Sequence, residues 1–335
     1  MTAAPPAAPA PGRPRKRRRP RVLILGLPYF GSMLARLLGE RGWEARFAHH
    51  PGRDPIGWAR LVPAVLRADV IYLISSRLDR FSPQALLIRL RRRPVVIHWV
   101  GTDVLIALDE HALGRASKGA ARRAVHWVDA PWLAGELGTM GIAAEHVQLP
   151  VDGLSQQAPP LPARFTVLLY LPVDAFDREV FDMETLLRLP AAFPAARFIL
   201  IPSPAATLPG PLPPKLETPG WVTDMDALWR DVTVQVRLTS HDGTSFMVLE
   251  ALSRGRYSIW TYPIDGGIAA RGYDAVHAAL VRLEREHAAG RLGLNQPGMA
   301  HARAAFDPAR AVTALDRALR AVARGEKRRE KRETG

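Results

Sequence analysis

The sequence of 335 residues contains no cysteine. This absence excludes a disulfide scaffold, a thiolate nucleophile and a zinc site with cysteine ligands, and it is compatible with a reducing compartment. No stretch approaches the roughly 18 consecutive apolar residues of a membrane-spanning helix. The first twenty residues also lack the order of a secretory signal, because their basic cluster comes last. We therefore expect a cytoplasmic protein, with peripheral attachment to the inner membrane face as an open alternative.

Acidic residues are missing from residues 1–21, which carry seven Arg or Lys. Residues 322–335 contribute a further +3, so only +4 of the net charge of +14 belongs to the body of the chain. A basic excess confined to the ends, without interleaved aromatic residues, does not indicate a nucleic-acid-binding fold. We expect residues 1–20 and 324–335 to be disordered basic tails that are either solvated or in contact with an anionic membrane.

Several catalytic motifs are also missing. Residues 26–31 (GLPYFG) have the glycine spacing of a P-loop, but Ser32 and Met33 stand where Lys and Ser or Thr are required. The chain contains no G-x-G-x-x-G, H-E-x-x-H or G-x-S-x-G motif. The adjacent His49 and His50 are more typical of a loop than of a metal site. We expect neither a resident cofactor nor a metal ion.

The body of the chain alternates between strand and helix patterns. Arg21–Leu27 (RVLILGL) is a continuous apolar run, as expected for a strand buried on both faces. Further strands are predicted at Trp43–Ala48, Val70–Ser75 and Val95–Val100, with helices at Phe30–Arg41, Trp58–Arg67 and Ala85–Arg92. Beyond the Pro- and Gln-rich residues 151–163, strands are predicted at Phe165–Tyr170, Phe198–Pro202, Val232–Leu238 and Tyr257–Thr261, with a helix at Glu179–Leu189.

This alternation on both sides of a linker predicts an α/β fold with two Rossmann-like parallel-sheet domains facing each other across a cleft. The apolar stripe of a last helix predicts that it packs against another element. The predicted divisions are a tail at 1–20, a first domain at 21–150, a linker at 151–163, a second domain at 164–305, a helix at 306–323 and a tail at 324–335.

The polar turn at 239–243, between a predicted strand and a predicted helix, is the clearest candidate for a binding site. The backbone amides of Gly243, Thr244 and Ser245 fall at the helix N-terminus, where free N–H groups and the helix dipole favour a phosphate. Asp242 is either a further residue of this site or the N-cap of the helix, a role for which Ser and Thr compete.

Glu250 falls on the apolar side of the same helix, three residues after Met247 and four after Phe246. A carboxylate in that position needs hydrogen-bond partners. They are either Arg254, at i,i+4, or a pair of ribose hydroxyls that enter from the cleft.

The spacing Asp242-x7-Glu250, which follows the segment GWV (220–222), resembles the acid-x7-Glu motif of retaining GT-B glycosyltransferases of the group 1 type. The segment HWVGTD (98–103), which follows a predicted strand, is similar to the one that lines the acceptor side of the cleft in that family. The resemblance covers residues 21–323 in architecture. It implies a GT-B fold and the transfer of a sugar from a nucleotide-diphosphate-sugar donor.

The resemblance also implies roles for individual residues. Glu250 would bind the nucleotide ribose, Asp242 would contact the donor sugar, and the amides of 243–245 would hold the diphosphate. The implied set is Asp242, Arg237 and His98 for catalysis; Gly243, Thr244, Ser245, Glu250, Val222 and Gly31 for the donor; and Gly101, Thr102 and Asp103 on the acceptor side.

The sequence departs from the family pattern at residues 171–178 (LPVDAFDR), where family members usually carry Arg and Lys that neutralise the departing diphosphate. The Lys is missing here, and the first acid of the motif is Asp rather than the commoner Glu. Arg237 would supply the replacement charge, unless it forms an ion pair with Asp231 or Asp242, since a buried Arg needs a partner.

Two functions therefore remain open at this point. The first is a metal-independent retaining glycosyltransferase of polysaccharide biosynthesis, whose acceptor is a glycan, a lipid-linked molecule or a small molecule. The second is a catalytically degenerate GT-B protein that binds nucleotide or glycan, or that scaffolds glycan assembly.

Overall fold

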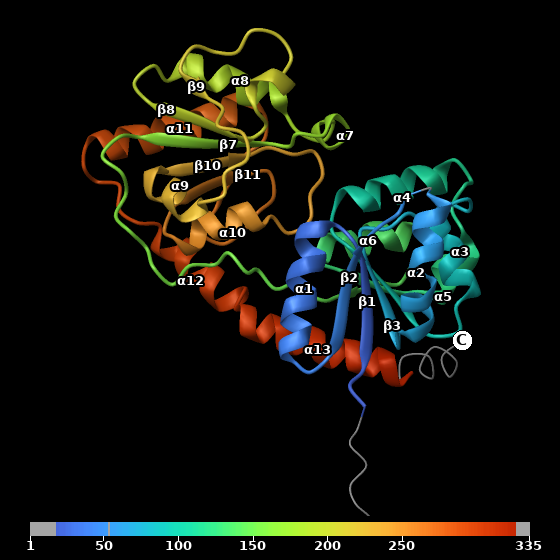
Figure 1. The fold of residues 1–335 in the computed structure, drawn as a ribbon. Helices are drawn as coiled ribbons and strands as arrows, with labels where there is room; N and C mark the ends of the chain where they lie inside the picture. The colour runs from blue at the N-terminus through green and yellow to red at the C-terminus, as the bar shows by residue number, and fades with distance from the viewer. Residues whose placement is uncertain (1–17, 53, 326–335) are drawn as a thin grey trace, which may run out of the picture.

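Two six-stranded parallel β-sheets form the centre of the structure, a computed structural model that describes residues 18–52 and 54–325 (Figure 1). Most of the two predicted basic tails lies outside these ranges. Among the described residues, no helix combines the length and the apolar character needed to cross a membrane. The prediction of two parallel-sheet α/β domains is confirmed.

The first sheet has the strand order β2-β1-β3-β4-β5-β6. Its strands are β1 (Arg21–Gly26), β2 (Glu44–His49), β3 (Val70–Ile74), β4 (Val95–Trp99), β5 (Val125–Val128) and β6 (Glu145–His146). Both faces of this sheet are covered, which explains why its central strands consist almost entirely of apolar residues.

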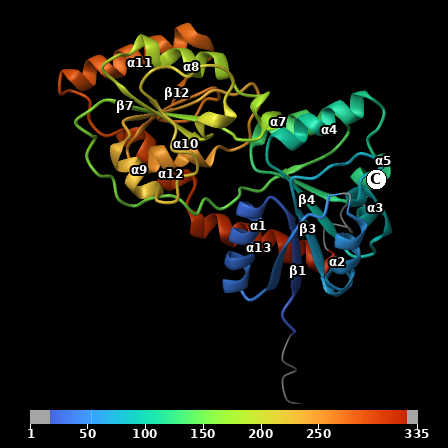
Figure 2. The same ribbon diagram turned by 45° about the horizontal axis from the view of Figure 1, so that its top comes forward.

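One face of the first sheet packs against five helices, and the other packs against α1 (Pro28–Glu40) and the C-terminal α13 (Pro308–Arg324). The five helices are α2 (Pro55–Arg67), α3 (Pro83–Leu90), α4 (Thr102–Ala112), α5 (Lys118–Arg123) and α6 (Pro131–Thr139). α13 lies far along the chain from its neighbours, and it returns from the second domain to bury Leu315, Leu319 and Val322 on the first sheet (Figures 1 and 2). The apolar residues predicted along one side of this helix therefore pack against the first sheet, as expected.

The second sheet has the order β12-β11-β10-β7-β8-β9, the arrangement of doubly wound nucleotide-binding folds. Its strands are β7 (Thr166–Leu171), β8 (Arg197–Pro202), β9 (Leu216–Glu217), β10 (Val234–Arg237), β11 (Tyr257–Trp260) and β12 (Ile268–Ala269). The accompanying helices are α7 (Ala175–Arg178), α8 (Met183–Ala192), α9 (Met225–Asp231), α10 (Phe246–Ser253), α11 (Gly272–Ala288) and α12 (Gln296–Ala305), with a 3₁₀ turn at Ala205–Thr207. α8 and α11 cover one face, and α9 and α10 cover the other.

The helix predicted at Glu179–Leu189 begins later than expected. α8 starts at Met183, because the Asp182 side chain accepts a hydrogen bond from the Thr185 amide and caps it there. Phe181, just before this cap, instead forms an isolated bridge with Thr239, so the preceding segment lies against the turn that follows β10.

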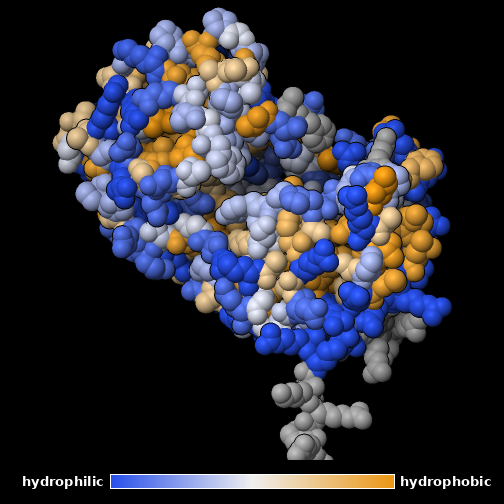
Figure 3. Space-filling model, viewed as in Figure 1, coloured by the Kyte–Doolittle hydropathy of each residue, from blue (hydrophilic) through white to orange (hydrophobic). Residues whose placement is uncertain are grey.

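The carboxyl ends of the strands in the two sheets point toward the junction between the domains, where ligands bind in open α/β sheets. Figure 3 shows the surface hollowed between the two lobes. The turn after β10 and the start of α10 meet the first domain at this junction, with the Phe246 ring 5.1 Å from that of Phe30.

Candidate functional site

The end of β10 carries a buried ion pair. The Arg237 guanidinium forms two hydrogen bonds with the Asp242 carboxylate, of 2.6 Å from Nε and 2.9 Å from Nη2. It also lies over the rings of Tyr170 and Phe181, 4.8 and 5.0 Å from their centroids. Burial alone would lower the pKa of Arg237, but the neighbouring Asp242 outweighs it and the pKa is raised. Arg237 is therefore a fixed cation at the carboxyl end of the second sheet.

Two of the alternatives that the sequence left open are resolved by these contacts. Asp242, not Asp231, is the ion-pair partner of Arg237, while Asp231 pairs with Arg197. Asp242 is also not the helix cap, because the Ser245 side chain accepts the hydrogen bond from the Val248 amide at the start of α10.

The turn at 242–244 is in direct contact with the first domain. A Cβ atom added to Gly243 would lie 2.2 Å from the Val100 carbonyl oxygen and 2.9 Å from an Asp129 carboxylate oxygen. A Cβ atom on Gly101, whose φ of 133° already favours glycine, would lie 2.8 Å from the Gly243 amide nitrogen. Thr244 donates from its hydroxyl to the Asp129 carbonyl at 2.8 Å. The predicted phosphate-binding amides thus lie against the predicted acceptor-side segment.

Three side chains that the sequence did not single out extend this contact. The Trp132 indole of α6 donates to the Asp242 carbonyl at 2.8 Å and stacks on Tyr262, with centroids 4.8 Å apart. The Glu136 carboxylate forms a 2.7 Å hydrogen bond with the His241 ring. The sequence carries no signal for any of the three: Asp129 follows β5, which was not predicted, and a Trp and a Glu within a helix are ordinary.

Buried carboxylates gather where the two domains meet. Burial raises the pKa of Asp103 to about 6, although it accepts hydrogen bonds from the amides of Val100 and Gly101. Burial also raises the pKa of Asp129 well above its usual range, and the nearby Asp103 and Asp242 raise it further. A diphosphate placed at the Gly243 amide would face these acids.

Asp103 also lines a cavity of about 400 Å³ in the first domain. The cavity lies at the carboxyl ends of β1 and β3, where the strand order reverses. Ser76 Oγ and Asp103 Oδ2 are buried there and have no hydrogen-bond partner among the described residues. Ser75, at the same wall, has a φ of 58°, a strained conformation of the kind that clusters at ligand sites.

The raised pKa of Asp103 leads to a testable pH dependence. Between the unfolded value of 3.8 and the folded value of about 6, the folded state keeps a proton that the unfolded state has released, so stability falls as pH rises. Relative to wild type, Asp103→Asn should gain up to about 3 kcal/mol of unfolding free energy between pH 4 and 6. Calorimetry at stepped pH measures this. Asp109→Asn, at an exposed position of the same helix, should show the same pH dependence of the unfolding free energy as wild type. If Asp103→Asn also showed the wild-type pH dependence, the raised pKa of Asp103 would be contradicted.

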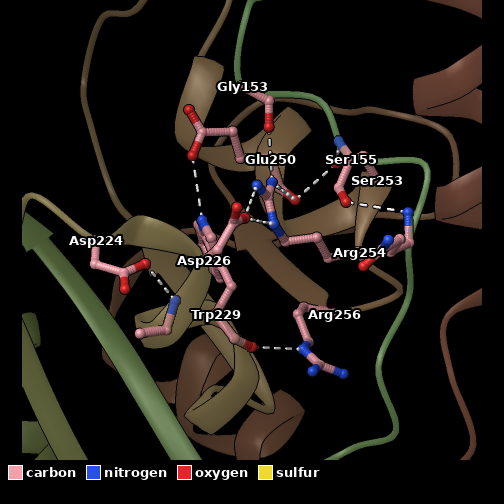
Figure 4. Close-up of polar contacts among 11 residues, drawn as sticks. Gly153, Ser155, Asp224, Asp226, Trp229, Glu250, Ser253, Arg254 and Arg256 are labelled. Carbon is pink, nitrogen blue, oxygen red and sulfur yellow. Dashed lines mark hydrogen bonds and ion pairs between the residues drawn. The ribbon is translucent and has the colours of Figure 1, made fainter.

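Glu250 lies on α10 at the domain junction and is 9% exposed (Figure 4). Its carboxylate accepts a hydrogen bond from the Trp229 indole at 3.2 Å and lies against Gly153 of the linker. Arg254 does not pair with the Glu250 carboxylate: its guanidinium binds Asp226 at 2.6 Å, the Gly153 carbonyl at 2.8 Å and the Glu250 backbone carbonyl at 3.3 Å. Burial raises the pKa of Glu250, so the ionised carboxylate costs folding stability where it stands.

Two of the expected site residues pack inside the first domain. His98 is fully buried, is hydrogen-bonded to the Tyr72 hydroxyl and has a pKa lowered by burial to about 3. It faces the core beneath α1 and α13, so the expected catalytic role was wrong. Gly31 lies inside α1, where a Cβ atom would come within 2.2 Å of the Phe47 ring. Its lack of a side chain permits helix–strand packing, and its donor contact stays a prediction.

The remaining expected residues keep positions near the junction. Thr102 is the first residue of α4, directly after Gly101. Val222 packs against the cluster that contains Trp229, close to the helix of Glu250. In the segment that lacks the family's Lys, the Arg178 guanidinium is bound to the carbonyls of Pro172 and Val173. Among the described residues, no group of three or more His, Asp or Glu side chains is arranged to hold a metal ion.

No protein-family model and no curated protein sequence matches the chain. Solved structures do match it. Sucrose-phosphate synthase from Thermosynechococcus elongatus superimposes with a TM-score of 0.67 at 12% identity, covering 90% of this chain and 98% of that one. The lipopolysaccharide outer core galactosyltransferase WaaB, in its apo form, superimposes with a TM-score of 0.57 at 12% identity, covering 89% of this chain and 99% of that one. A mutant of S. aureus TarM in complex with Fondaparinux, alpha-GlcNAc-glycerol and UDP superimposes with a TM-score of 0.56 at 10% identity, covering 77% of this chain and 58% of that one.

At these identities the likeness concerns the fold. The chain has the GT-B architecture of two Rossmann-like domains whose carboxyl edges face each other. At the domain junction, the segments predicted for the donor and acceptor sides touch, with buried carboxylates on both sides of the contact.

Proposed function

We propose that this protein transfers a sugar from a nucleoside-diphosphate sugar to an acceptor hydroxyl, with retention of configuration and without a metal ion. The acceptor is a glycan, a lipid-linked molecule or a small molecule. The fold supports sugar transfer in general, and the complex of TarM with UDP supports the nucleotide class of the donor. Retention follows from the resemblance of the 242–250 spacing alone, and the anomeric configuration of the product tests it.

The observation that carries the proposal is the Glu250 carboxylate. Its pKa is raised by burial, so ionised Glu250 weakens the fold at neutral pH, and the hydrogen bond from Trp229 does not require a charge. A costly buried carboxylate is a functional-site candidate. Two ribose hydroxyls would supply donors that an ionised carboxylate accepts better than a neutral amide does.

The cavity beside Asp103 supports the acceptor half of the proposal. Asp103 Oδ2 can accept from a sugar hydroxyl, and Ser76 Oγ can donate to one or accept from one. Both lie on the first domain, and Asp103 is electrostatically coupled to Asp129 at the contact with Gly243. An acceptor in this cavity would therefore lie next to the junction where the donor sugar is expected.

Glu250→Gln tests the donor site. The substitution keeps the shape and the acceptor for Trp229, so the free energy of unfolding should stay the same or rise at pH 7. Nucleotide binding should weaken by about 1–3 kcal/mol, the range for hydrogen bonds to charged groups. A thermal-shift screen of nucleotides and nucleotide sugars identifies the ligand, and calorimetry then gives both affinities. Glu184→Gln, 85% exposed on α8, is the matched control.

Two results would count against this assignment. If Glu250→Gln loses stability without ligand and retains its affinity, the carboxylate has a structural role. If transfer in the wild type stops on addition of EDTA, the metal-free mechanism is wrong while the donor site stands.

A nucleotide-binding protein without transferase activity is the second candidate function. The pairing of Arg237 with Asp242 favours it, because the cation expected to stabilise the leaving diphosphate is already bound. Arg178, the Arg of the 171–178 segment, is likewise held by the carbonyls of Pro172, Val173 and Thr207. Nucleotide binding without product, over the acceptors that fit the cavity, would support this alternative.

A further inference from the structure

The outer surface of α2 and α3 is apolar, although surface helices normally present polar side chains outward. Leu66 is 69% exposed, Leu90 is 73% exposed and Phe81, just before α3, is 77% exposed. We call the exposed set the α2–α3 face; its members are Ile56, Val62, Leu66, Phe81, Leu86 and Leu90. Contiguous exposed apolar surface of this kind marks an interaction site.

The two helices form one continuous surface. Their inner sides pack on the same core beneath the first sheet, and the Arg91 guanidinium at the end of α3 donates to the Ala68 carbonyl at the end of α2. Figure 3 shows hydrophobic residues gathered over this part of the lower lobe, with hydrophilic residues along its lower border.

The two helices of the α2–α3 face are basic. Residues 55–67 and 83–93 contain six Arg and no acid, although Arg91 is buried and Asp54, Asp69 and Asp79 lie just outside these ranges. The chain also enters the fold beside this face, because Arg18 pairs with Asp69, two residues beyond α2. Residues 1–17, which precede it, add four further bases and no acid.

We infer that the α2–α3 face docks on an anionic lipid bilayer, with its apolar side chains at the acyl boundary and its arginines among the headgroups. Apolar area combined with basic residues is the composition of membrane-surface helices, and each basic residue near an anionic surface adds about 1 kcal/mol. A second copy of this chain fits less well, because an isologous contact would bring arginines against arginines.

Docking in this way would set the orientation of the cavity. Phe81 belongs to both the α2–α3 face and the wall of the 400 Å³ cavity, so the cavity opens at the edge of the docked surface. An acceptor carried on a membrane lipid would then reach Asp103 from the bilayer. This consequence rests on the proposed transfer, whereas the docking itself does not.

The test is co-sedimentation of the full chain with vesicles of phosphatidylcholine, with and without phosphatidylglycerol. The wild type should bind the anionic vesicles, more strongly at low salt. Leu66→Glu with Leu90→Glu should lower the partition about a hundredfold, since each leucine withdrawn from an apolar contact removes about a tenfold factor. Leu66→Met with Leu90→Met should bind like wild type. Both positions are exposed, so melting temperatures should be unchanged.

Three further measurements decide between occupants. Val281→Glu, 43% exposed on the second domain, should bind vesicles like wild type. Replacement of Arg13, Arg15, Lys16 and Arg17 by Ser should weaken vesicle binding, but in this background Leu66→Glu with Leu90→Glu should still lower the partition about a hundredfold. Undiminished binding by the Leu66→Glu/Leu90→Glu variant would overturn the proposal and assign the attraction to the terminal bases. A lipid-free dimer that the same variant dissociates would overturn it in favour of a second copy. Vesicle binding is measured without donor or acceptor, so its failure is distinct from a failure of sugar transfer.

Discussion

Gly243→Ala should lower the rate of sugar transfer about a hundredfold, because a displacement of about 1 Å at a reacting centre costs that much. The added Cβ would lie 2.2 Å from the Val100 carbonyl oxygen and 2.7 Å from its carbon, and both atoms belong to backbone that has no rotamer with which to move away. The contact is relieved only if the two domains separate at the junction. The backbone of Gly243 is not in the left-handed region, so the second domain itself accepts alanine.

Product formation and small-angle scattering on the same samples measure this effect. The variant should show a larger radius of gyration than wild type. The proposed ribose contact at Glu250 lies elsewhere on the second domain, so a change in nucleotide affinity would report on the proposed diphosphate contact at the Gly243 amide. Gly138→Ala, on α6 with open space around it, is the matched control and should be indistinguishable from wild type. Normal transfer by Gly243→Ala would mean that the closed contact is not part of the working state.

Much of the fold could be predicted from the sequence, because a strand buried on both faces must be a continuous apolar run. The predicted strands at Arg21–Leu27, Val70–Ser75 and Val95–Val100 correspond to β1, β3 and β4, with ends displaced by one residue. β5 was missed because it has only four residues and His126 interrupts its apolar run. β6, β9 and β12 contain two residues each, which is too short for any periodicity.

The site was less predictable, since its contacts join distant parts of the chain. The pairing of Arg237 with Asp242 spans five residues and was one of two alternatives open from the sequence. The contact of Gly243 with Val100 depends on how two domains meet, which no local pattern encodes. His98 was assigned wrongly for a related reason: a strand buried on both faces shows no alternation, so the sequence does not reveal that this side chain faces a core.

Arg237→Met should lower the free energy of unfolding by about 3–5 kcal/mol, the cost of leaving one member of a buried ion pair without its partner. Asp242, 9% exposed, would retain the hydrogen bond from the Trp260 indole at 3.1 Å. Arg237→Lys keeps the charge but cannot form both hydrogen bonds of the guanidinium, so its free energy of unfolding should fall by less. Combining Arg237→Met with Asp242→Leu should be less destabilising than Arg237→Met alone, since the uncompensated charge is then removed as well.

Arg197→Met provides the comparison that separates burial from charge. Arg197 starts β8 and also binds two carboxylates, Glu217 at 2.8 Å and Asp231 at 3.0 Å, but it is 28% exposed. Arg197→Met should therefore lower the free energy of unfolding by about 1 kcal/mol or less. Urea unfolding of the variants, together with transfer assays on those that fold, distinguishes the two roles of Arg237. A large loss of stability in Arg237→Met alone identifies a structural ion pair. A stable Arg237→Met variant that binds donor but forms no product would instead mean that the guanidinium leaves Asp242 when the donor is bound and stabilises the departing diphosphate, where negative charge grows in the transition state.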